Sequence, residues 1–403
     1  MTYDLLQGVR VLELGGFISA PYCAKLLADL GAQVIKVEPV AGGDVARSYG
    51  PFPNDEPSLE ASGLFLCLNT NKMGITLDFR TATGRKLLSE LLSISDVVVE
   101  NLPLPEAEVL GLTTGEALKT NKSLILAAIT PFGLTGPYRN YKAYEINLTA
   151  ASGASVGIGL PDREPLDFPV PLAGYQAGVC AATATLSAVL ARSISGRGQL
   201  VDVSEAECLA SVFTGPEILM WMYQWRITRR TGHHARDFPY PNCSLRCKDG
   251  YVYMGAPEAR QWRKLLELMG QPSWAKDPRF SDRTAINTYY ADEVDALMEE
   301  WMAAFTTEEL FQLGLANRLP LAPVKTPAEV LADTRFAGFF EEIETPAAGR
   351  LKYPVAPYQV YGAHPPKPAR PPPALGQDNQ AIYCGLLGRS NDDLVKLFQT
   401  GVI

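Results

Sequence analysis

The strongest constraint on the fold is a regular alternation of short apolar runs with helix-length segments in the first half of the chain. Residues 9–14 (VRVLEL) form an apolar run of strand length, and Gly15-Gly16 leads from it into a helical pattern over 21–30. Gly31 ends that helix, and residues 32–38 (AQVIKVE) form a second β-branched run. The alternation continues with strand patterns at 75–79, 96–101, 123–129 and GRGQLVDVS, and with helical patterns at 83–92 and 175–192.

This alternation predicts an α/β fold with a mainly parallel sheet that helices cover on both faces. We expect the N-terminal part of a large domain at 1–208, followed by a linker helix at 209–239 that is rich in Trp, Met and Tyr. Residues 240–330 combine a hairpin-like stretch with two helical patterns, which indicates a smaller α+β domain. Residues 331–403 include a Pro-rich stretch, which must run extended.

Composition excludes several classes of partner. The chain has 36 Lys and Arg against 44 Asp and Glu, so it has no overall basic field with which to bind nucleic acid. No run approaches the roughly 18 consecutive apolar residues of a membrane span, and the N-terminus lacks a basic region followed by an apolar core. Seven cysteines, an odd number, suit reduced thiols better than a disulfide framework. We therefore expect a cytoplasmic protein.

Two features near the predicted strand ends concern ligands. Gly15-Gly16 lacks the G-x-G-x-x-G spacing of nicotinamide sites, so a tight turn is favoured, although the following helix N-terminus can receive a phosphate. Because the carboxyl ends of parallel strands meet at one edge, we also expect an elongated anionic ligand there. The cations available to it are Lys36, Arg47, Lys72, Arg80 and Lys142, with Phe17, Ile18 and Leu102 as an apolar shelf.

Histidine and cysteine patterns give no strong site. Cys243 and Cys247 follow His233 and His234, but the spacing lacks the Cys-x2-Cys pairs of zinc sites, so structural cysteines are favoured and no metal is expected. The one other histidine is His364. None of the three histidines lies near a serine or cysteine in a nucleophile-elbow context, which disfavours a hydrolase.

Several stretches together resemble the family III CoA-transferases (CaiB/BaiF type). They are VLELGGFISAPYCAKLLADLGAQVIKVEPVAGGD, NTNKMGITLDF, SDVVVEN, FGLTGPYRNYKAYE and SGRGQLVDVSEAE, which follow in this order between residues 11 and 207. The resemblance as a whole covers nearly the whole chain. The resemblance implies a broken Rossmann-like large domain to which residues 331–403 return, a smaller α+β domain between, and an interlaced dimer. It also implies coenzyme A or an acyl-CoA as substrate, with no permanently bound cofactor.

The family's chemistry rests on one aspartate that attacks an acyl-CoA thioester. Its motif resembles V-x-D-x-x-x-G, and the matching stretch here, PLAGYQAG, has Gly174 at the nucleophile position. No acid occurs between Phe168 and Ala191, so a shift in alignment does not restore the motif. In the racemase branch of the family, a histidine acts as the base, and Tyr144 stands at its position.

The resemblance also assigns CoA contacts to seven positions: Phe17, Ile18, Leu77, Arg80, Asn101, Leu102 and Lys142. Pro39 and Val109 stand where formyl-CoA transferase carries arginines, and Gly255 alone remains of the glycine-rich loop. Since charge-assisted contacts to the CoA phosphates are thereby lost, CoA binding by this chain is expected to be weak or vestigial.

These features support three hypotheses. The first is a non-catalytic subunit of a heteromeric CoA-transferase, for example α2β2, whose homologous sister chain supplies the aspartate. This chain alone would then be inactive. It most resembles such a subunit of benzylsuccinate CoA-transferase, an enzyme of anaerobic aromatic degradation, which implies succinyl-CoA as donor. The second is a self-sufficient transferase with a relocated carboxylate, Glu145 before Asp167, although a positioning role for Glu145 is favoured. The third is a non-enzymatic scaffold or acyl-CoA-binding protein.

Overall fold

A six-stranded parallel sheet organises the larger part of the molecule. The computed structural model describes residues 3–113, 119, 121–213, 215–227, 230–234, 238–362 and 368–403. The strands are β1 (Arg10–Leu14), β2 (Gln33–Glu38), β3 (Lys72–Thr76), β4 (Val97–Glu100), β5 (Ile125–Thr130) and β6 (Gln199–Ser204). Their order is β3-β2-β1-β4-β5-β6, and every pairing is parallel. The predicted α/β class is confirmed, and the order is that of a doubly wound Rossmann sheet.

Burial on both faces explains why these segments form strands. β4 (VVVE) and β5 (ILAAIT) are buried at every position, as expected for central strands of a parallel sheet. The third strand begins at Lys72 and ends at Thr76, whereas the apolar pattern predicted 75–79. The apolar pattern did not predict a strand residue at Lys72 because this residue is charged; it is nevertheless buried, paired across the sheet with Glu13.

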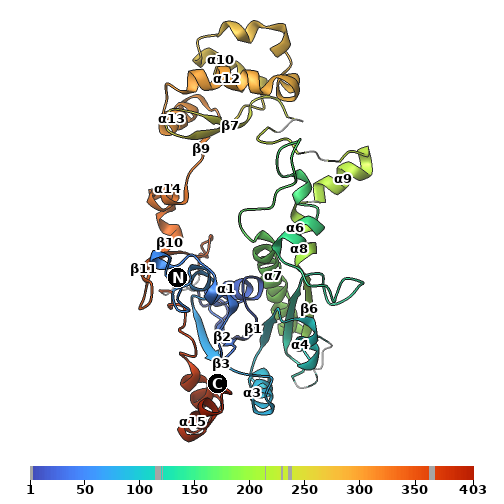
Figure 1. The fold of residues 1–403 in the computed structure, drawn as a ribbon, viewed down its shortest axis with the longest axis vertical. Helices are drawn as coiled ribbons and strands as arrows, with labels where there is room; N and C mark the ends of the chain where they lie inside the picture. The colour runs from blue at the N-terminus through green and yellow to red at the C-terminus, as the bar shows by residue number, and fades with distance from the viewer. Residues whose placement is uncertain are drawn as a thin grey trace. The chain divides into compact units, whose positions relative to one another are not determined.

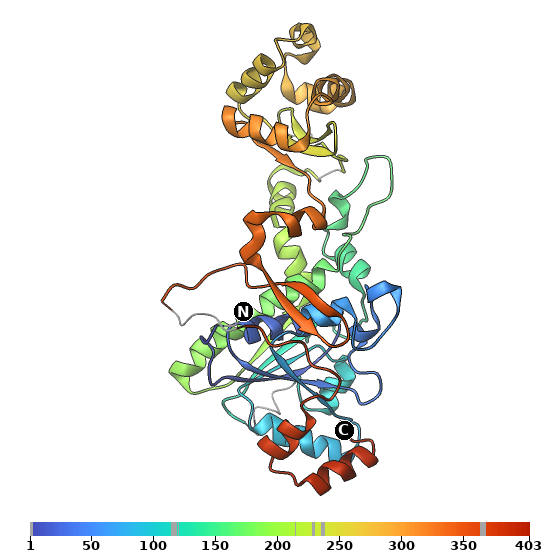
Figure 2. The same ribbon diagram turned by 90° about the vertical axis from the view of Figure 1, so that its left-hand side faces the viewer.

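Helices cover both faces of this sheet (Figure 1). On one face, α1 (Ser19–Asp29) and α7 (Leu172–Ser195) pack their alanines against β-branched residues of the strands. On the other, α3 (Ala82–Ser93), α4 (Leu104–Val109) and the C-terminal residues Val402 and Ile403 enclose a leucine-rich core. The C-terminal segment with α15 (Asn391–Gln399) thus returns to the sheet, where the Tyr383 hydroxyl donates to the Thr76 carbonyl at 2.8 Å (Figure 2).

Helix α7 is long and apolar enough, by length and composition, to cross a membrane. It instead packs closely along α1, a role for which its small residues are suited. A Cβ at Gly178 would lie 3.0 Å from the Ser19 carbonyl oxygen, so only glycine permits this approach of the two helices. One side of α7 is therefore packed on α1 and the sheet, while Leu190 and Ile194 near its end are exposed.

The chain divides into two compact units. Unit 1 comprises residues 1–154, 167–225 and 338–403, and unit 2 comprises 155–166 and 226–337. Unit 1 also contains α2 (Gly63–Leu68), α6 (Glu145–Ala151), α8 (Glu205–Phe213), α9 (Gly215–Gln224), β10 (Phe340–Thr345) and β11 (Gly349–Pro354). The stretch 209–239, expected as one linker helix, holds parts of α8 and α9, and residues 214, 228–229 and 235–237 lie outside the described chain. His364 also lies outside it.

Unit 2 has its own antiparallel sheet and apolar core. The sheet has the order β7-β8-β9. Its core joins Leu245, Val252 and Met254 of the sheet to Val294 and Met298 of a covering helix. The elements are β7 (Asn242–Arg246), β8 (Tyr251–Gly255), β9 (Leu321–Pro323), α10 (Ala259–Leu268), α11 (Arg283–Ala285), α12 (Ala291–Met302), α13 (Thr307–Asn317) and α14 (Pro327–Ala332).

Candidate functional site

The candidate site lies at the carboxyl ends of β1 and β4, where the strand order reverses. Doubly wound sheets bind ligands at this point because the loops of two adjacent strands diverge there. Asn101, after β4, joins the two loops: its side-chain oxygen accepts from the Gly16 N–H at 3.0 Å, and its amide donates to the Gly16 carbonyl at 2.9 Å and to Ser19 Oγ at 3.0 Å. A Cβ at Gly15 would lie 2.3 Å from Asn101 Oδ1, so glycine is required here.

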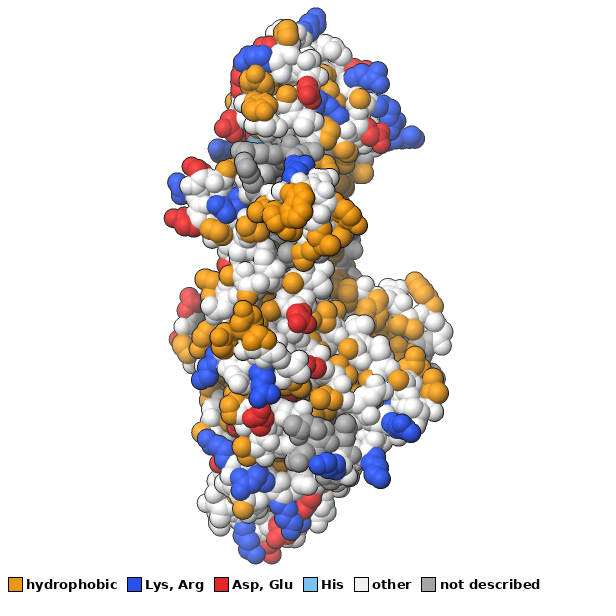
Figure 3. Space-filling model, turned by 90° about the vertical axis from the view of Figure 1, so that its right-hand side faces the viewer, with side chains coloured by type: hydrophobic (Ala, Val, Ile, Leu, Met, Phe, Trp, Pro, Cys, Tyr) orange, Lys and Arg blue, Asp and Glu red, His pale blue; other side chains and the backbone are white. Residues whose placement is uncertain are grey.

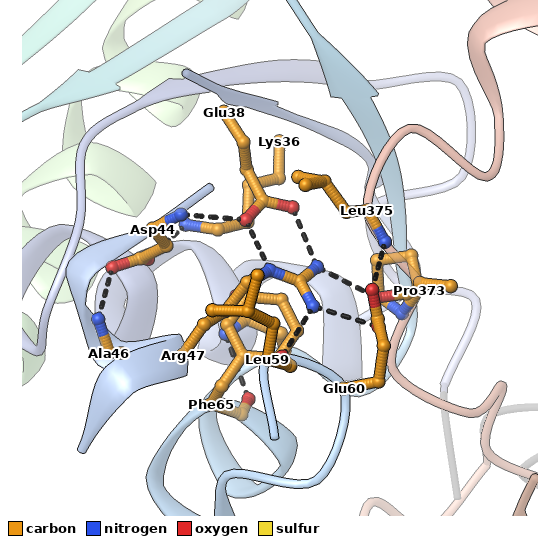
Figure 4. Close-up of polar contacts among 12 residues, drawn as sticks. Lys36, Glu38, Asp44, Ala46, Arg47, Leu59, Glu60, Phe65, Pro373 and Leu375 are labelled. Carbon is orange, nitrogen blue, oxygen red and sulfur yellow. Dashed lines mark hydrogen bonds and ion pairs between the residues drawn. The ribbon is translucent and has the colours of Figure 1, made fainter. Parts of the chain in front are cut away.

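The turn after Gly16 is held by a buried carboxylate. Phe17 has a left-handed backbone with φ of 64°, which is costly for a residue with a Cβ. Its N–H donates to Asp44 Oδ1 at 2.9 Å, and its ring packs edge-on against Tyr49 with centroids 4.9 Å apart. Asp44 in turn lies 2.7 Å from Lys36 Nζ (Figure 4). The strained turn therefore depends on a charge pair beneath it.

Three of the cations expected to bind an anionic ligand are buried in the core, and the prediction is wrong for them. Lys36, Lys72 and Arg47 have fully buried side chains. Glu13 bridges the two lysines, at 2.7 Å from Lys36 Nζ and 2.8 Å from Lys72 Nζ. Burial works against the charge of Lys36, but Asp44 and Glu13 raise its pKa, whereas burial lowers the pKa of Lys72 to about 8.

Arg47 links the buried charged residues to the C-terminal segment near Pro373 by hydrogen bonds (Figure 4). Its guanidinium donates to Glu38 at 2.7 and 2.9 Å and to Glu60 at 2.9 Å, and it stacks 3.6 Å above the Phe65 ring. The same group donates to the Pro373 carbonyl at 3.1 Å. With a fifth hydrogen bond to the Leu59 carbonyl at 3.1 Å, every Arg47 donor is used inside the protein, which leaves none for a phosphate.

The nucleophile position lies in the first turn of α7. A Cβ built on Gly174 would lie 3.1 Å from Ile18 Cγ2 and 3.2 Å from Ile18 Cβ, so Ile18 occupies the space that a side chain there would need. Glu145, the first residue of α6, reaches the same turn: its Oε1 accepts from the Ala173 N–H at 2.6 Å, and Oε2 lies 3.5 Å from the Gly174 nitrogen. Burial raises the pKa of Glu145, and the hydrogen bonds from Ala173 and Gly174 oppose that rise.

A second carboxylate near this turn was not predicted from the sequence. Glu205 begins α8 directly after β6. Burial raises its pKa, a hydrogen bond with the Ser19 side chain lowers it, and the nearby charge of Glu145 raises it. Its position directly after a parallel strand was the signal available in the sequence. The first turn of α7 is therefore surrounded by two acidic side chains, Glu145 and Glu205, rather than by cations.

The structure brings some of the predicted CoA contacts together. Phe17, Ile18, Asn101 and Leu102 lie in the two loops joined by Asn101. Further out, Leu77 and Arg80 follow β3, where Leu77 is buried and Arg80 is exposed, paired with Asp78 at 2.8 Å. Lys142, before α6, is exposed, as are Pro39 and Val109. Contact of the seven residues with CoA stays a prediction.

Beside these loops, Glu100 ends β4 as a fully buried acid. One of its oxygens accepts from the Leu102 N–H at 2.8 Å, and the other has no hydrogen-bond partner. Burial raises the pKa of Glu100 to about 8. Glu100 therefore holds the start of the loop that carries Asn101 and Leu102 through the Leu102 N–H.

Comparison with known proteins gives consistent matches over the chain. The profile of CoA-transferase family III matches residues 6–379. Succinyl-CoA–D-citramalate CoA-transferase of Chloroflexus aurantiacus is 33% identical over 99% of this chain and 98% of its own length. The beta subunit of succinyl-CoA–L-malate CoA-transferase from the same organism is 30% identical over 81% of this chain and 80% of its own. The crystal structure of a CAIB/BAIF family protein from Brucella suis superposes with a TM-score of 0.85 at 30% identity, covering 96% of this chain and 100% of that one.

Proposed function

The chain belongs to CoA-transferase family III, and from this membership we propose that it is the subunit of a heteromeric CoA-transferase that lacks the attacking aspartate. The complex moves CoA between an acyl-CoA and a free carboxylic acid, and a homologous sister chain supplies the nucleophile. The observation that carries the proposal is the first turn of α7, where Gly174 has no side chain and Ile18 occupies the adjoining space.

The carboxylate that does reach this turn is poorly suited to attack a thioester. A nucleophile must stand about 3–3.5 Å from the reacting carbon with a free lone pair. Glu145 instead has both oxygens engaged by the backbone of α7: Oε1 accepts a 2.6 Å hydrogen bond from the Ala173 N–H, and Oε2 a 3.5 Å one from the Gly174 N–H. We therefore assign Glu145 to positioning the start of α7.

The names of two relatives supply the donor class. Both act with succinyl-CoA, and one of them is a subunit of its enzyme. We propose succinyl-CoA as donor and a carboxylic acid as acceptor, with benzylsuccinate the specific acceptor to test first. CoA is held mainly by the sister chain, because Pro39 and Val109 offer no charge to the phosphates, and each such contact is worth about 1.5–3 kcal/mol. Free thiols at all seven cysteines fit a cytoplasmic location.

An exposed apolar surface on α9 supports a partner chain. Trp221, Met222, Tyr223 and Trp225 lie at or just beyond the end of this helix, and Tyr223 and Trp225 are 80% and 73% exposed. Figure 3 shows hydrophobic side chains gathered on the face that carries α9. Clusters of this kind are uncommon on monomers and typical of interfaces. We propose that this surface packs against the sister chain.

The test is to express the chain alone and together with homologous CoA-transferase chains that carry the aspartate. We expect copurification, CoA transfer from succinyl-CoA by the mixture alone, and a hydroxylamine-sensitive acyl adduct on the sister chain. Replacement of the sister chain's aspartate should abolish transfer. An acyl adduct on the present chain, or full activity without a partner, would contradict the proposal.

A self-sufficient transferase is the second candidate, because the Glu145 carboxylate stands beside Gly174 at the nucleophile position. This candidate predicts transfer by the chain alone, lost in Glu145→Gln. Asp167→Asn is the comparison, since Asp167 is the other candidate for a relocated carboxylate and accepts from the neighbouring Phe168 N–H at 2.8 Å; transfer lost in Asp167→Asn and kept in Glu145→Gln would move the assignment to Asp167. Under the subunit proposal, Glu145→Gln lowers the activity of the mixture without removing the acyl adduct.

A further inference from the structure

Unit 2 contains a group of metal-ligating side chains that the transferase chemistry does not use. His233 and His234 precede β7, and Asp295 lies in the first half of α12. The Nε2 atoms of His233 and His234 lie 3.2 and 2.9 Å from the same oxygen, Asp295 Oδ2. The three side chains can each present one ligand atom within 4.8 Å of the others. Three donors from two chain segments therefore converge on one point.

His234 is the independent sign that something belongs at this point. The residue is 6% exposed, yet neither of its ring nitrogens makes a hydrogen bond of acceptable geometry with the described part of the chain. Nε2 is close to Asp295 Oδ2, but an N–H there is not aligned with the oxygen. A buried polar group left unpaired costs about 1–3 kcal/mol, so native proteins rarely leave one without a partner. Two imidazole nitrogens placed side by side near a carboxylate oxygen suit a shared cation better than two separate hydrogen bonds.

A hydrogen bond from Tyr240 orients the Asp295 carboxylate. The buried Tyr240 hydroxyl donates to Asp295 Oδ1 at 2.8 Å, which leaves Oδ2 directed to the histidines. Partners of this kind fix ligand orientation in metal sites. His233 has a side chain that is 52% exposed, so the point of convergence is open to water on that side. The site thus has a fixed carboxylate, Asp295, on its buried side and an accessible imidazole, His233, on its exposed side.

We propose that His233, His234 and Asp295 bind a divalent transition-metal ion, with zinc the ion that fits best. Two imidazoles and one carboxylate form a nitrogen-rich donor set, which suits zinc rather than magnesium or calcium. Ligand bonds of about 2.0–2.1 Å in a tetrahedral site place donor atoms about 3.3 Å apart, close to the 3.2 and 2.9 Å that separate the two histidines from Asp295 Oδ2. Water takes the fourth position on the exposed side of His233.

The two cysteines that follow in sequence are outside this site. Cys243 is fully buried in the core of unit 2, and the Cys247 thiol donates to the Gly250 carbonyl at 3.4 Å. The ion would instead tie the segment before β7 to α12, which itself forms part of that core. The site revises the sequence expectation that the chain holds no metal, because the ligand from α12 is 62 residues from His233. Its effect is a structural one, on unit 2, and is independent of the proposed transferase function.

The test measures zinc on the full-length protein. The chain is stripped with a chelator, dialysed against zinc and analysed by elemental analysis and calorimetric titration. We expect one zinc per chain, loss of that zinc in His234→Asn and Asp295→Asn, and affinity reduced about 10–100-fold in Tyr240→Phe. Cys247→Ser is the matched control and should keep the ion. Cobalt substitution gives a second readout, since thiolate ligands produce a charge-transfer band that a His-His-Asp site lacks.

Each outcome decides the proposal. If the wild-type chain binds no more zinc than His234→Asn, the two histidines are held to Asp295 by hydrogen bonds alone and the proposal fails. A cobalt spectrum with a thiolate band, or loss of zinc in Cys247→Ser, would move the site to the cysteines and also refute it. Circular dichroism checks folding, and if His234→Asn does not fold, the half-exposed His233→Asn replaces it. Zinc retained by folded His233→Asn at wild-type affinity would then overturn the assignment.

Discussion

Gly174→Ala tests whether the nucleophile position is filled by its surroundings. Alanine gains up to about 1 kcal/mol over glycine inside a helix. Against this gain, the new Cβ would lie 3.1 Å from Ile18 Cγ2 and 3.2 Å from Ile18 Cβ. Overpacking of this kind costs about 1–3 kcal/mol, so we expect a net loss of about 1 kcal/mol in the free energy of unfolding. Urea denaturation followed by fluorescence and circular dichroism measures it.

A double-mutant cycle identifies the cause of that loss. Ile18→Ala alone should cost about 2–5 kcal/mol, because Ile18 is buried. In its background the Gly174→Ala change should cost less or become stabilising, with a coupling of about 0.5–3 kcal/mol. Gly178→Ala is the comparison within the same helix: its Cβ would meet the Ser19 carbonyl at 3.0 Å, and because backbone yields less readily than a side chain, we expect a larger loss.

The refuting result is clear. If Gly174→Ala stabilises the protein by the full helix preference while Ile18 is intact, the space beside Gly174 is open, and crowding is not what excludes a side chain. The same reasoning limits Gly174→Asp, whose Cβ would meet Ile18 and whose backbone nitrogen lies 3.5 Å from the Glu145 carboxylate. We expect that variant to turn over far more slowly than an intact transferase, since the surrounding groups are not arranged for it. Turnover near the level of an intact enzyme would contradict us.

Three further changes test the groups around the site. Burial raises the pKa of Glu100 from 4.5 to about 8, so between these pH values the folded chain keeps a proton that the unfolded chain loses. The free energy of unfolding therefore falls as the pH rises from 4.5 to about 8. Glu100→Gln should reduce this fall, which urea denaturation at about pH 5 and pH 8 measures. Arg47→Ala should cost about 3–5 kcal/mol by the same method, whereas the exposed control Arg80→Ala should leave the free energy of unfolding nearly unchanged. Asp44→Asn should speed amide hydrogen exchange at Phe17, and unchanged exchange would show that Asp44 does not hold the turn.

Local patterns in the sequence were enough to predict the parallel sheet. β4 and β5 are apolar at nearly every position, and the Gly31 turn separates α1 from β2. The apolar runs and the glycine between them are therefore enough to locate these elements. The absence of an acid at Gly174 is likewise visible in the sequence, because it concerns the identity of one residue in a motif. Such features depend on residues close together in the chain, where propensity and spacing are informative.

Charge placement could not be predicted in the same way. Lys36 and Lys72 were expected at a ligand site, yet the sheet register sets Glu13 opposite Lys36 and brings both lysines to this one carboxylate in the core. Glu205 and Glu145 meet at α7 for a similar reason, since separate helices carry them there. Whether a charged residue faces solvent or a buried partner depends on the register and packing of distant segments, which local sequence does not encode. The amino-acid sequence alone therefore indicated the strands, the helices and the glycine at position 174, while tertiary packing decided which charges remain available to a ligand.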